Sequence, residues 1–340
     1  MRFVRSAAVA AVLVAAGSAA PALAQGQSPT TDAIRARGQL ICAVAPSTAG
    51  FSLPDSRGVW RGIDVDYCRA VAAAILGDPN KVRFVPSTTV QRFPMLQSGE
   101  VDMLVRSTTW TLAREASLGF LFAGINYYDG QGFMVKKASG VTSARQLNGA
   151  TVCVQPGTTT ELNMTDYFRA NNIRFTPVVI ENVEELRNAF IAGRCDAYTN
   201  DSSSLASFRA TQANAEDYVL LPEIISKEPL GPVVRKGDDR FFDIVRWTSF
   251  AMLTAEEFGI TQANVDSFAT NTNPDIQRFM GRTGDLGKMM GLDNDWAVKV
   301  IKAVGNFGEV WDRNITPLGV PRGINNLWTK GGLHYAPPIR

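Results

Sequence analysis

The segment 150–161 has the sequence ATVCVQPGTTTE and decides how the fold of this chain is interpreted. Its first five residues form a short apolar run rich in β-branched residues, which predicts a buried strand. A turn with Pro156 and Gly157 follows, and the three threonines then lead into a predicted helix at 160–170. A strand that passes through a polar turn into a helix is the unit of an α/β sheet, whose ligand groups lie at strand ends.

Two more predicted strands end in polar groups. The apolar run 101–105 leads to the sequence TTWTLAR at 108–114, and the sequence CDAYTND at 195–201 ends another strand. Together, the three strand ends carry hydroxyls, one arginine and one carboxylate. A guanidinium holds a carboxylate through two parallel charge-assisted bonds, and hydroxyls with helix-start amides take its other lone pairs. An aspartate takes an ammonium group, so this set predicts a site for a zwitterion, an amino acid.

The same alternation of strands and helices occurs in two halves of the chain. Strands and helices alternate before residue 106 and again after residue 149, which predicts two copies of one doubly wound α/β design. The strands are expected at 40–44, 82–85, 101–105, 150–154, 175–180 and 197–198, and the helices at 63–76, 91–98, 160–170 and 183–192.

The domain organisation follows from two apolar segments outside this pattern. Residues 132–135 and 230–234 are predicted to be strands that cross between two lobes and act as a hinge. We expect residues 25–132 and 230–340 to form a discontinuous first lobe with a C-terminal extension, and residues 133–229 to form the second lobe.

The N-terminus predicts export. It has a basic start with Arg2 and Arg5, an Ala- and Val-rich run at 7–16, and a small-x-small site at 22–24. This arrangement is typical of a cleaved signal peptide, predicted at 1–24. A membrane anchor is the alternative, but the run is shorter than the ~20 residues that a spanning helix needs.

The charge balance excludes one class of partner. The chain has 34 Lys and Arg against 32 Asp and Glu, a formal charge of +2, and removing Arg2 and Arg5 brings it near zero. A nucleic-acid or anionic-membrane binder needs a basic face or stripe. We therefore expect no nucleic-acid partner.

The four cysteines predict disulfides rather than a metal site. An even count in an exported chain favours bridges, and chain order suggests Cys42–Cys68 and Cys153–Cys195, each within one lobe. Free buried thiols and a metal site are the alternatives. The chain has no C-x-x-C and its one histidine, His334, is near the C-terminus, so zinc is disfavoured. No metal and no cofactor are expected.

These features resemble the solute-binding proteins of polar amino-acid ABC transporters (family 3), particularly the general L-amino-acid-binding periplasmic subset. The likeness covers nearly the whole mature chain, and the order and spacing of its motifs are specific. The segments that carry it are 62–70, 108–114, 127–133, 155–161 and 192–201, with 304–309 and 322–325 in the tail.

The resemblance implies a type II periplasmic-binding-protein fold, whose two lobes close on the ligand, and a role for each polar residue. Arg114 binds the α-carboxylate, assisted by the hydroxyl or amide of Thr109. Thr159 and its amide meet the same carboxylate from the second lobe. Ser107 accepts from the ammonium, and Asp201 pairs with it.

The resemblance also places Phe51 against the ligand, and the residues themselves leave alternatives open. Thr158 is included in the site with its neighbouring threonines, although such hydroxyls most often cap a helix. Asp201 has the same alternative, and Arg114 has that of a surface arginine. Trp110 fits the cleft and the core equally. Asp64 and Asp66 are interpreted as fold residues, Asp64 as a helix cap.

The residue types favour a binding protein over an enzyme. A single histidine outside the site segments excludes a His-based triad or His-metal site there, and no phosphate-binding G-x-x-x-x-G-K-[ST] occurs. A carboxylate pair among Asp129, Glu161 and Asp201 leaves a dehydratase-like enzyme as the alternative. A ligand sensor that feeds a chemoreceptor is a third class. We expect a monomeric periplasmic component that binds L-amino acids and delivers them to a membrane permease.

The ligand range is predicted to be broad. The chosen charged anchors all address the backbone end of an amino acid, while Phe51 and Trp110 offer apolar surface to its side chain. Arg106 in the same strand is an alternative contact for an acidic ligand side chain, but it is not chosen as a site residue. No second arginine is assigned to the site, so strict selection for glutamate is not predicted.

Overall fold

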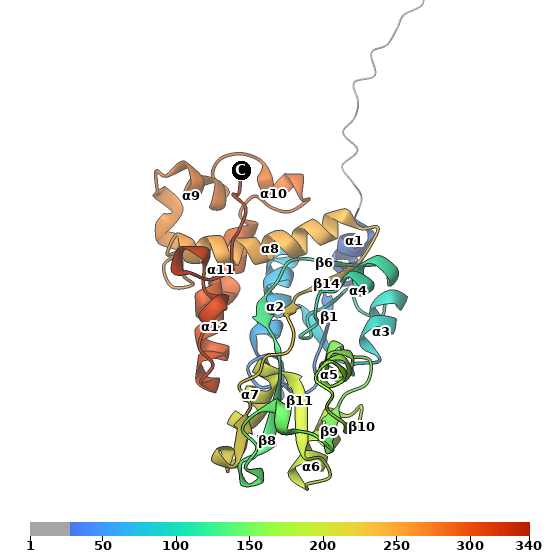
Figure 1. Ribbon diagram of the computed structural model, residues 1–340. Coiled ribbons are helices and arrows are strands. Elements are labelled where there is room, and N and C mark those ends of the chain that lie inside the picture. The colour runs from blue at the N-terminus through green and yellow to red at the C-terminus, as the bar shows by residue number, and fades with distance from the viewer. Residues whose placement is uncertain (1–27) are drawn as a thin grey trace, which may run out of the picture.

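The computed structural model describes residues 28–340, in two lobes that each contain a five-stranded sheet (Figure 1). In the first sheet, with strand order β4-β1-β5-β14-β6, β1 lies parallel between β4 and β5, as the strand–helix alternation predicts. The strands are β1 (Leu40–Val44), β4 (Val82–Pro86), β5 (Met103–Leu104), β6 (Phe120–Phe122) and β14 (Val233–Arg235). The predicted signal peptide at 1–24 lies outside the described residues.

The second sheet repeats this arrangement with the order β10-β9-β11-β8-β12. Strand β9 lies between β10 and β11 and is parallel to both, as β1 is to β4 and β5 in the first sheet. The predicted pair of similar α/β lobes is therefore what the structure has. The strands are β8 (Gln131–Lys136), β9 (Ala150–Val154), β10 (Phe175–Val179), β11 (Ala197–Asp201) and β12 (Tyr218–Leu220).

Helices connect the parallel strands and place their first residues at the strand ends. Helix α2 is rich in alanine, is buried along most of its length, and ends at Gly77, which has the left-handed backbone that favours glycine. The first lobe contains α1 (Pro29–Arg37), α2 (Ile63–Leu76), α3 (Arg92–Ser98) and α4 (Leu112–Ser117). The second contains α5 (Thr159–Ala170), α6 (Val183–Ile191) and α7 (Ser202–Ala210).

Two short antiparallel strands, β7 (Tyr127–Asp129) and β13 (Glu228–Leu230), connect the two sheets. The prediction that 132–135 and 230–234 cross between the lobes is wrong in detail. Residues 131–136 pair with β11 in the second sheet, and Val233 pairs with β5 in the first. These apolar runs are buried sheet strands, so the crossing lies a few residues earlier on each chain segment. The exact lobe limits stay a prediction.

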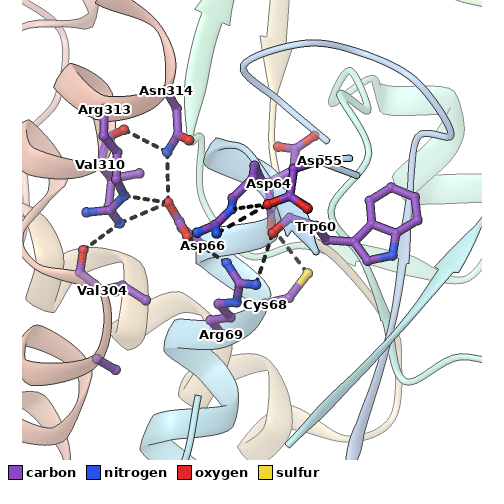
Figure 2. A network of polar contacts seen from close by, with 12 residues as sticks. Asp55, Trp60, Asp64, Asp66, Cys68, Arg69, Val304, Val310, Arg313 and Asn314 are labelled. Atoms are coloured by element: carbon purple, nitrogen blue, oxygen red, sulfur yellow. Dashed lines mark hydrogen bonds and ion pairs between the residues drawn. The ribbon is translucent and has the colours of Figure 1, made fainter. Parts of the chain in front are cut away.

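The C-terminal segment adds helices, of which α8 (Asp239–Glu257), α11 (Trp296–Val304) and α12 (Phe307–Asn314) pack against α2 (Figure 1). Asp66 on α2 pairs with Arg313 at 2.8 Å and accepts from Asn314 at 2.7 Å, which fastens α12 to the first lobe (Figure 2). Asp66 is thus a fold residue, as predicted. The other helices of this segment, α9 (Pro274–Phe279) and α10 (Leu286–Met289), lie above α8 in the view of Figure 1. No helix between residues 28 and 340 meets the length and hydrophobicity needed to span a membrane.

The structure joins the cysteines as the sequence predicted. Cys42 of β1 is bonded to Cys68 of α2, and Cys153 of β9 is bonded to Cys195 before β11. Each bridge fixes a strand to a neighbouring element of its own lobe, so neither restricts rotation of the lobes about β7 and β13.

We expect non-reducing peptide mapping to find only these two linkages. Reduction should lower the free energy of unfolding by about 2–4 kcal/mol per bridge, because each closes a loop of 26 or 42 residues. A Cys68–Cys153 linkage would contradict the fold, since it would tie the two lobes together.

Candidate ligand-binding site

The two lobes contact each other across the cleft between them. Thr89 of the first lobe donates to the carbonyl oxygen of Pro156 at 2.9 Å, and Arg187 of the second donates to that of Ser47 at 2.8 Å. Such bonds between lobes define a closed arrangement. The cleft that they cover lies at the carboxyl ends of β1, β5, β9 and β11.

The cavity in this cleft has a largely polar lining contributed by both lobes. Five of the residues predicted from the sequence line it: Ser107, Thr109, Thr158, Thr159 and Asp201. Among the others are Thr48, Thr89, Arg92, Arg106, Gln155, Thr160, Asn200 and Ser204.

Phe51, Trp110 and Arg114 are not in the lining. Phe51 is buried in the core of the first lobe, 5.2 Å from the ring of Tyr127. Trp110 stacks on Phe122 at 5.6 Å. The predicted apolar surface for the ligand side chain is therefore absent from this cavity, because both rings are used in packing within the first lobe.

Asp201 supplies an unpaired carboxylate. It stands at the N-cap position of α7 but makes no capping bond, and it is buried. Among residues 28–340, no donor is hydrogen-bonded to its side chain. Burial raises the pKa of Asp201 well above its ordinary value, and the nearby Asp129 and Glu228 raise it further. A cation beside this group would relieve both effects, which fits the predicted pairing with an ammonium.

Ser107 is held by a buried acid. Its backbone φ is +42°, and its amide and hydroxyl donate to Asp64 at 3.0 and 3.4 Å. Asn126 donates to the same carboxylate at 3.0 Å, and burial raises the pKa of Asp64 to about 6. Asp64 is thus a fold residue but not a cap of α2, whose N-cap is Gly62. Because the Ser107 hydroxyl donates its proton to the hydrogen bond with Asp64, its oxygen can only accept a hydrogen bond from a ligand.

Two buried arginines face this acidic side, and the sequence had assigned neither to the site. Arg92 begins α3 and is 3% exposed, and its Nε has no hydrogen-bond partner. Arg106 donates from Nε to the carbonyl oxygen of Ser87 at 2.9 Å. Burial, together with the neighbouring arginines, holds the pKa of Arg92 well below its usual range. The pKa of Arg106 is lowered to about 10, chiefly by burial. An anion between them would stabilise both charges.

Arg114 lies directly behind the lining. It is buried, not the surface arginine of the alternative interpretation, and its Nη1 donates to the carbonyl oxygen of Thr109 at 2.7 Å. Its guanidinium carbon also lies 5.3 Å from the ring centre of Phe93. Burial lowers its pKa, while Glu228 and Asp201 act in the opposite direction. Its place in the binding of a carboxylate stays a prediction.

The threonine run serves the helix and the cavity at once. Thr158 is the N-cap of α5, where its hydroxyl accepts from the amide of Glu161 at 3.1 Å. Thr159 follows in the first turn, and its hydroxyl approaches that of Thr109 to 3.3 Å. The start of α5 thus brings a hydroxyl and the partial positive charge of a helix N-terminus to the cleft.

Comparisons with known proteins agree with this geometry. Residues 40–262 match the model of the bacterial extracellular solute-binding proteins, family 3. The chain belongs to this family. Its fold is that of the type II periplasmic binding proteins, whose two-lobed structures superpose on it.

The similarity to individual members spans nearly the full chain. This chain is 53% identical over 340 residues to the general L-amino acid-binding periplasmic protein AapJ of Rhizobium johnstonii, and the match covers 98% of each chain. It is 55% identical to the glutamate/glutamine/aspartate/asparagine-binding protein BztA of Rhodobacter capsulatus, covering 99% of this chain and 98% of that one. A periplasmic binding protein of Brucella ovis, solved with glutathione bound, superposes with a TM-score of 0.90. It is 56% identical and covers 92% of this chain and 100% of its own.

Proposed function

We propose that this protein is the periplasmic substrate-binding component of an ABC transporter for L-amino acids. It works as a monomer, takes its ligand between the two lobes, and presents the closed form to a membrane permease. The names of AapJ and BztA support the ligand class, and their similarity extends over the whole chain.

The observation that carries the proposal is the separation of charge inside the cavity. Asp201 lies unpaired on the second lobe, and Arg92 and Arg106 lie on the first lobe, with Arg114 behind Thr109. A buried charge without a partner is costly, so each of these groups gains from a ligand charge of opposite sign. An amino acid carries both signs on two groups attached to one carbon atom, and its binding would hold the two lobes together.

The arginines also suggest which side chains bind most tightly. Arg114 is assigned to the α-carboxylate, which leaves Arg92 and Arg106 for a second acceptor. A side-chain carboxylate would satisfy them with charge-assisted bonds, and a side-chain amide oxygen would do so more weakly. We therefore propose that the site accepts several polar L-amino acids and binds the acidic ones, L-glutamate and L-aspartate, most tightly.

Closure follows from the position of the anchors. The arginines belong to the first lobe and Asp201 to the second, and the chain passes between the lobes at β7 and β13. A ligand that bonds to both lobes favours the closed form by its differential affinity for the two forms. Closure then removes the charges from water, which strengthens each ion pair in the cavity.

Isothermal titration calorimetry of the mature chain against the common L-amino acids tests the proposal. We expect one-to-one binding to several polar amino acids, tightest for L-glutamate and L-aspartate, with the ligand recovered unchanged. Decarboxylated amines should not bind, because they lack the group assigned to Arg114. Absence of binding to every amino acid would refute the proposal, and conversion of the ligand to a product would favour an enzyme.

A further inference from the structure

Glu228 is a buried carboxylate on the crossing strand β13, directly opposite Asp129 of β7. Its Oε2 accepts from the hydroxyl of Thr109 at 2.6 Å and from that of Thr159 at 2.8 Å. Thr109 follows β5 of the first lobe, and Thr159 opens α5 of the second. One carboxylate on the connection between the lobes is therefore bonded to both of them.

The other oxygen of Glu228 is equally occupied. Oε1 accepts from Ser226 at 2.6 Å and from the side-chain amide of Asn163 at 2.7 Å. In the described part of the chain, no lysine or arginine forms an ion pair with Glu228. Four uncharged donors bind its two oxygens, so the whole carboxylate is fixed in place.

This arrangement determines the direction of two hydroxyl protons. A threonine hydroxyl has one proton to donate and two lone pairs that accept. Thr109 and Thr159 both line the cavity, and both donate their proton to Glu228. Toward the ligand they therefore present only lone pairs, and a carboxylate there would meet oxygen atoms that repel it. Only their backbone amides remain to serve a ligand carboxylate.

We propose that Glu228 is a positioning residue: it turns the hydroxyls of Thr109 and Thr159 into acceptors for the ligand ammonium. This rests on the proposed function, because it takes the ligand to be an amino acid. An ammonium has three donors, and Asp201 with the two hydroxyls supplies acceptors from both lobes. The two oriented hydroxyls favour an α-amino group. They disfavour the corresponding 2-oxo acid, because its keto oxygen can only accept hydrogen bonds.

The local charges support this assignment. Glu228 and Asp129 both raise the pKa of Asp201, after the larger effect of burial, so the three carboxylates act on one region. Arg92 and Arg114 are the cations whose charges act on Asp201 from the first lobe. The negative groups thus lie on the crossing strands and the second lobe, where the ammonium would be held.

The variant Glu228→Gln separates positioning from mere structural support. The side-chain nitrogen of Asn163 donates to Oε1, so we expect the glutamine oxygen on that side and its NH₂ toward the two threonines. The NH₂ then donates to the threonine oxygens, and at least one hydroxyl proton turns toward the cavity. The polarity of the site is reversed while its shape is kept.

The test measures the affinities of L-glutamate and 2-oxoglutarate for the full mature chain by calorimetry and competition. In Glu228→Gln we expect L-glutamate to bind about 10- to 100-fold more weakly, while 2-oxoglutarate binds equally well or better. Ser226→Ala is the matched control, because it removes a bond to Oε1 and leaves both threonine hydroxyls unchanged. Its ratio of the two affinities should equal that of the wild type.

Equal weakening of both ligands in Glu228→Gln, or no change in either, would overturn the proposal and leave Glu228 a structural residue. If that variant does not fold, the variant Thr159→Val tests the proposal instead. It removes one accepting hydroxyl and keeps the shape of the side chain. It should weaken L-glutamate and spare 2-oxoglutarate; the opposite order would overturn the proposal. Wild-type protein that binds no amino acid would instead refute the proposed function itself, before any variant is compared.

Discussion

Replacing Arg114 with alanine should weaken the binding of every amino acid by at least about a hundredfold and leave the protein folded. Arg114 is buried beside Thr109, and its bond to the Thr109 carbonyl is its one side-chain hydrogen bond within residues 28–340. Most of its donors are thus available to a carboxylate. Removing one partner of a buried pair costs roughly 3–5 kcal/mol, and each 1.4 kcal/mol is a factor of about ten.

Calorimetry on the variant, with circular dichroism to follow unfolding, checks this expectation. Arg169→Ala is the matched control, because Arg169 is a largely exposed arginine on α5 and should leave affinity unchanged. The effect should be the same for acidic and neutral amino acids, since the α-carboxylate is common to all. Near-normal affinity in Arg114→Ala would remove Arg114 from the site.

The sequence predicted those parts of the site that lie at the ends of parallel strands. Ser107 and Thr109 follow β5, and Asp201 ends β11, and the structure brings all three to one cavity. This was foreseeable because the carboxyl ends of parallel strands meet at one edge of a sheet. The strand–helix alternation was predictable for a different reason: the spacing of apolar residues along the chain indicates which face of a helix or strand is buried.

Other parts of the site had no such signal. Arg92 opens a helix, and Glu228 lies on a crossing strand beside the apolar run that follows it. Both are charged residues, which usually lie at the surface, and their burial becomes visible only in the folded structure. Phe51 and Trp110 show the converse limit, because large rings favour any water-excluding environment. The sequence cannot distinguish a core that belongs to one lobe from a cleft between two.

The second large effect is expected at Arg92, where Arg92→Met should remove the preference for acidic ligands. Arg92 is 3% exposed, its Nε has no partner, and Arg106 and Arg114 add to the effect of burial in lowering its pKa. The folded protein thus carries a charge that burial disfavours, and a ligand carboxylate would compensate it. We expect L-glutamate and L-aspartate to bind about a hundredfold more weakly, because each loses a charge-assisted bond worth about 1.5–3 kcal/mol.

The same variant separates the charge of the ligand side chain from its shape. L-glutamine should lose less than about tenfold, because its amide forms only a neutral bond of about 1 kcal/mol with Arg92. The free energy of unfolding should stay equal or rise, since methionine replaces a desolvated cation with an apolar chain of similar length. Arg83→Met, at an exposed position of β4, is the matched control for both measurements. Equal losses of affinity for L-glutamate and L-glutamine would show that Arg92 supports the fold of the cleft and does not contact the ligand side chain.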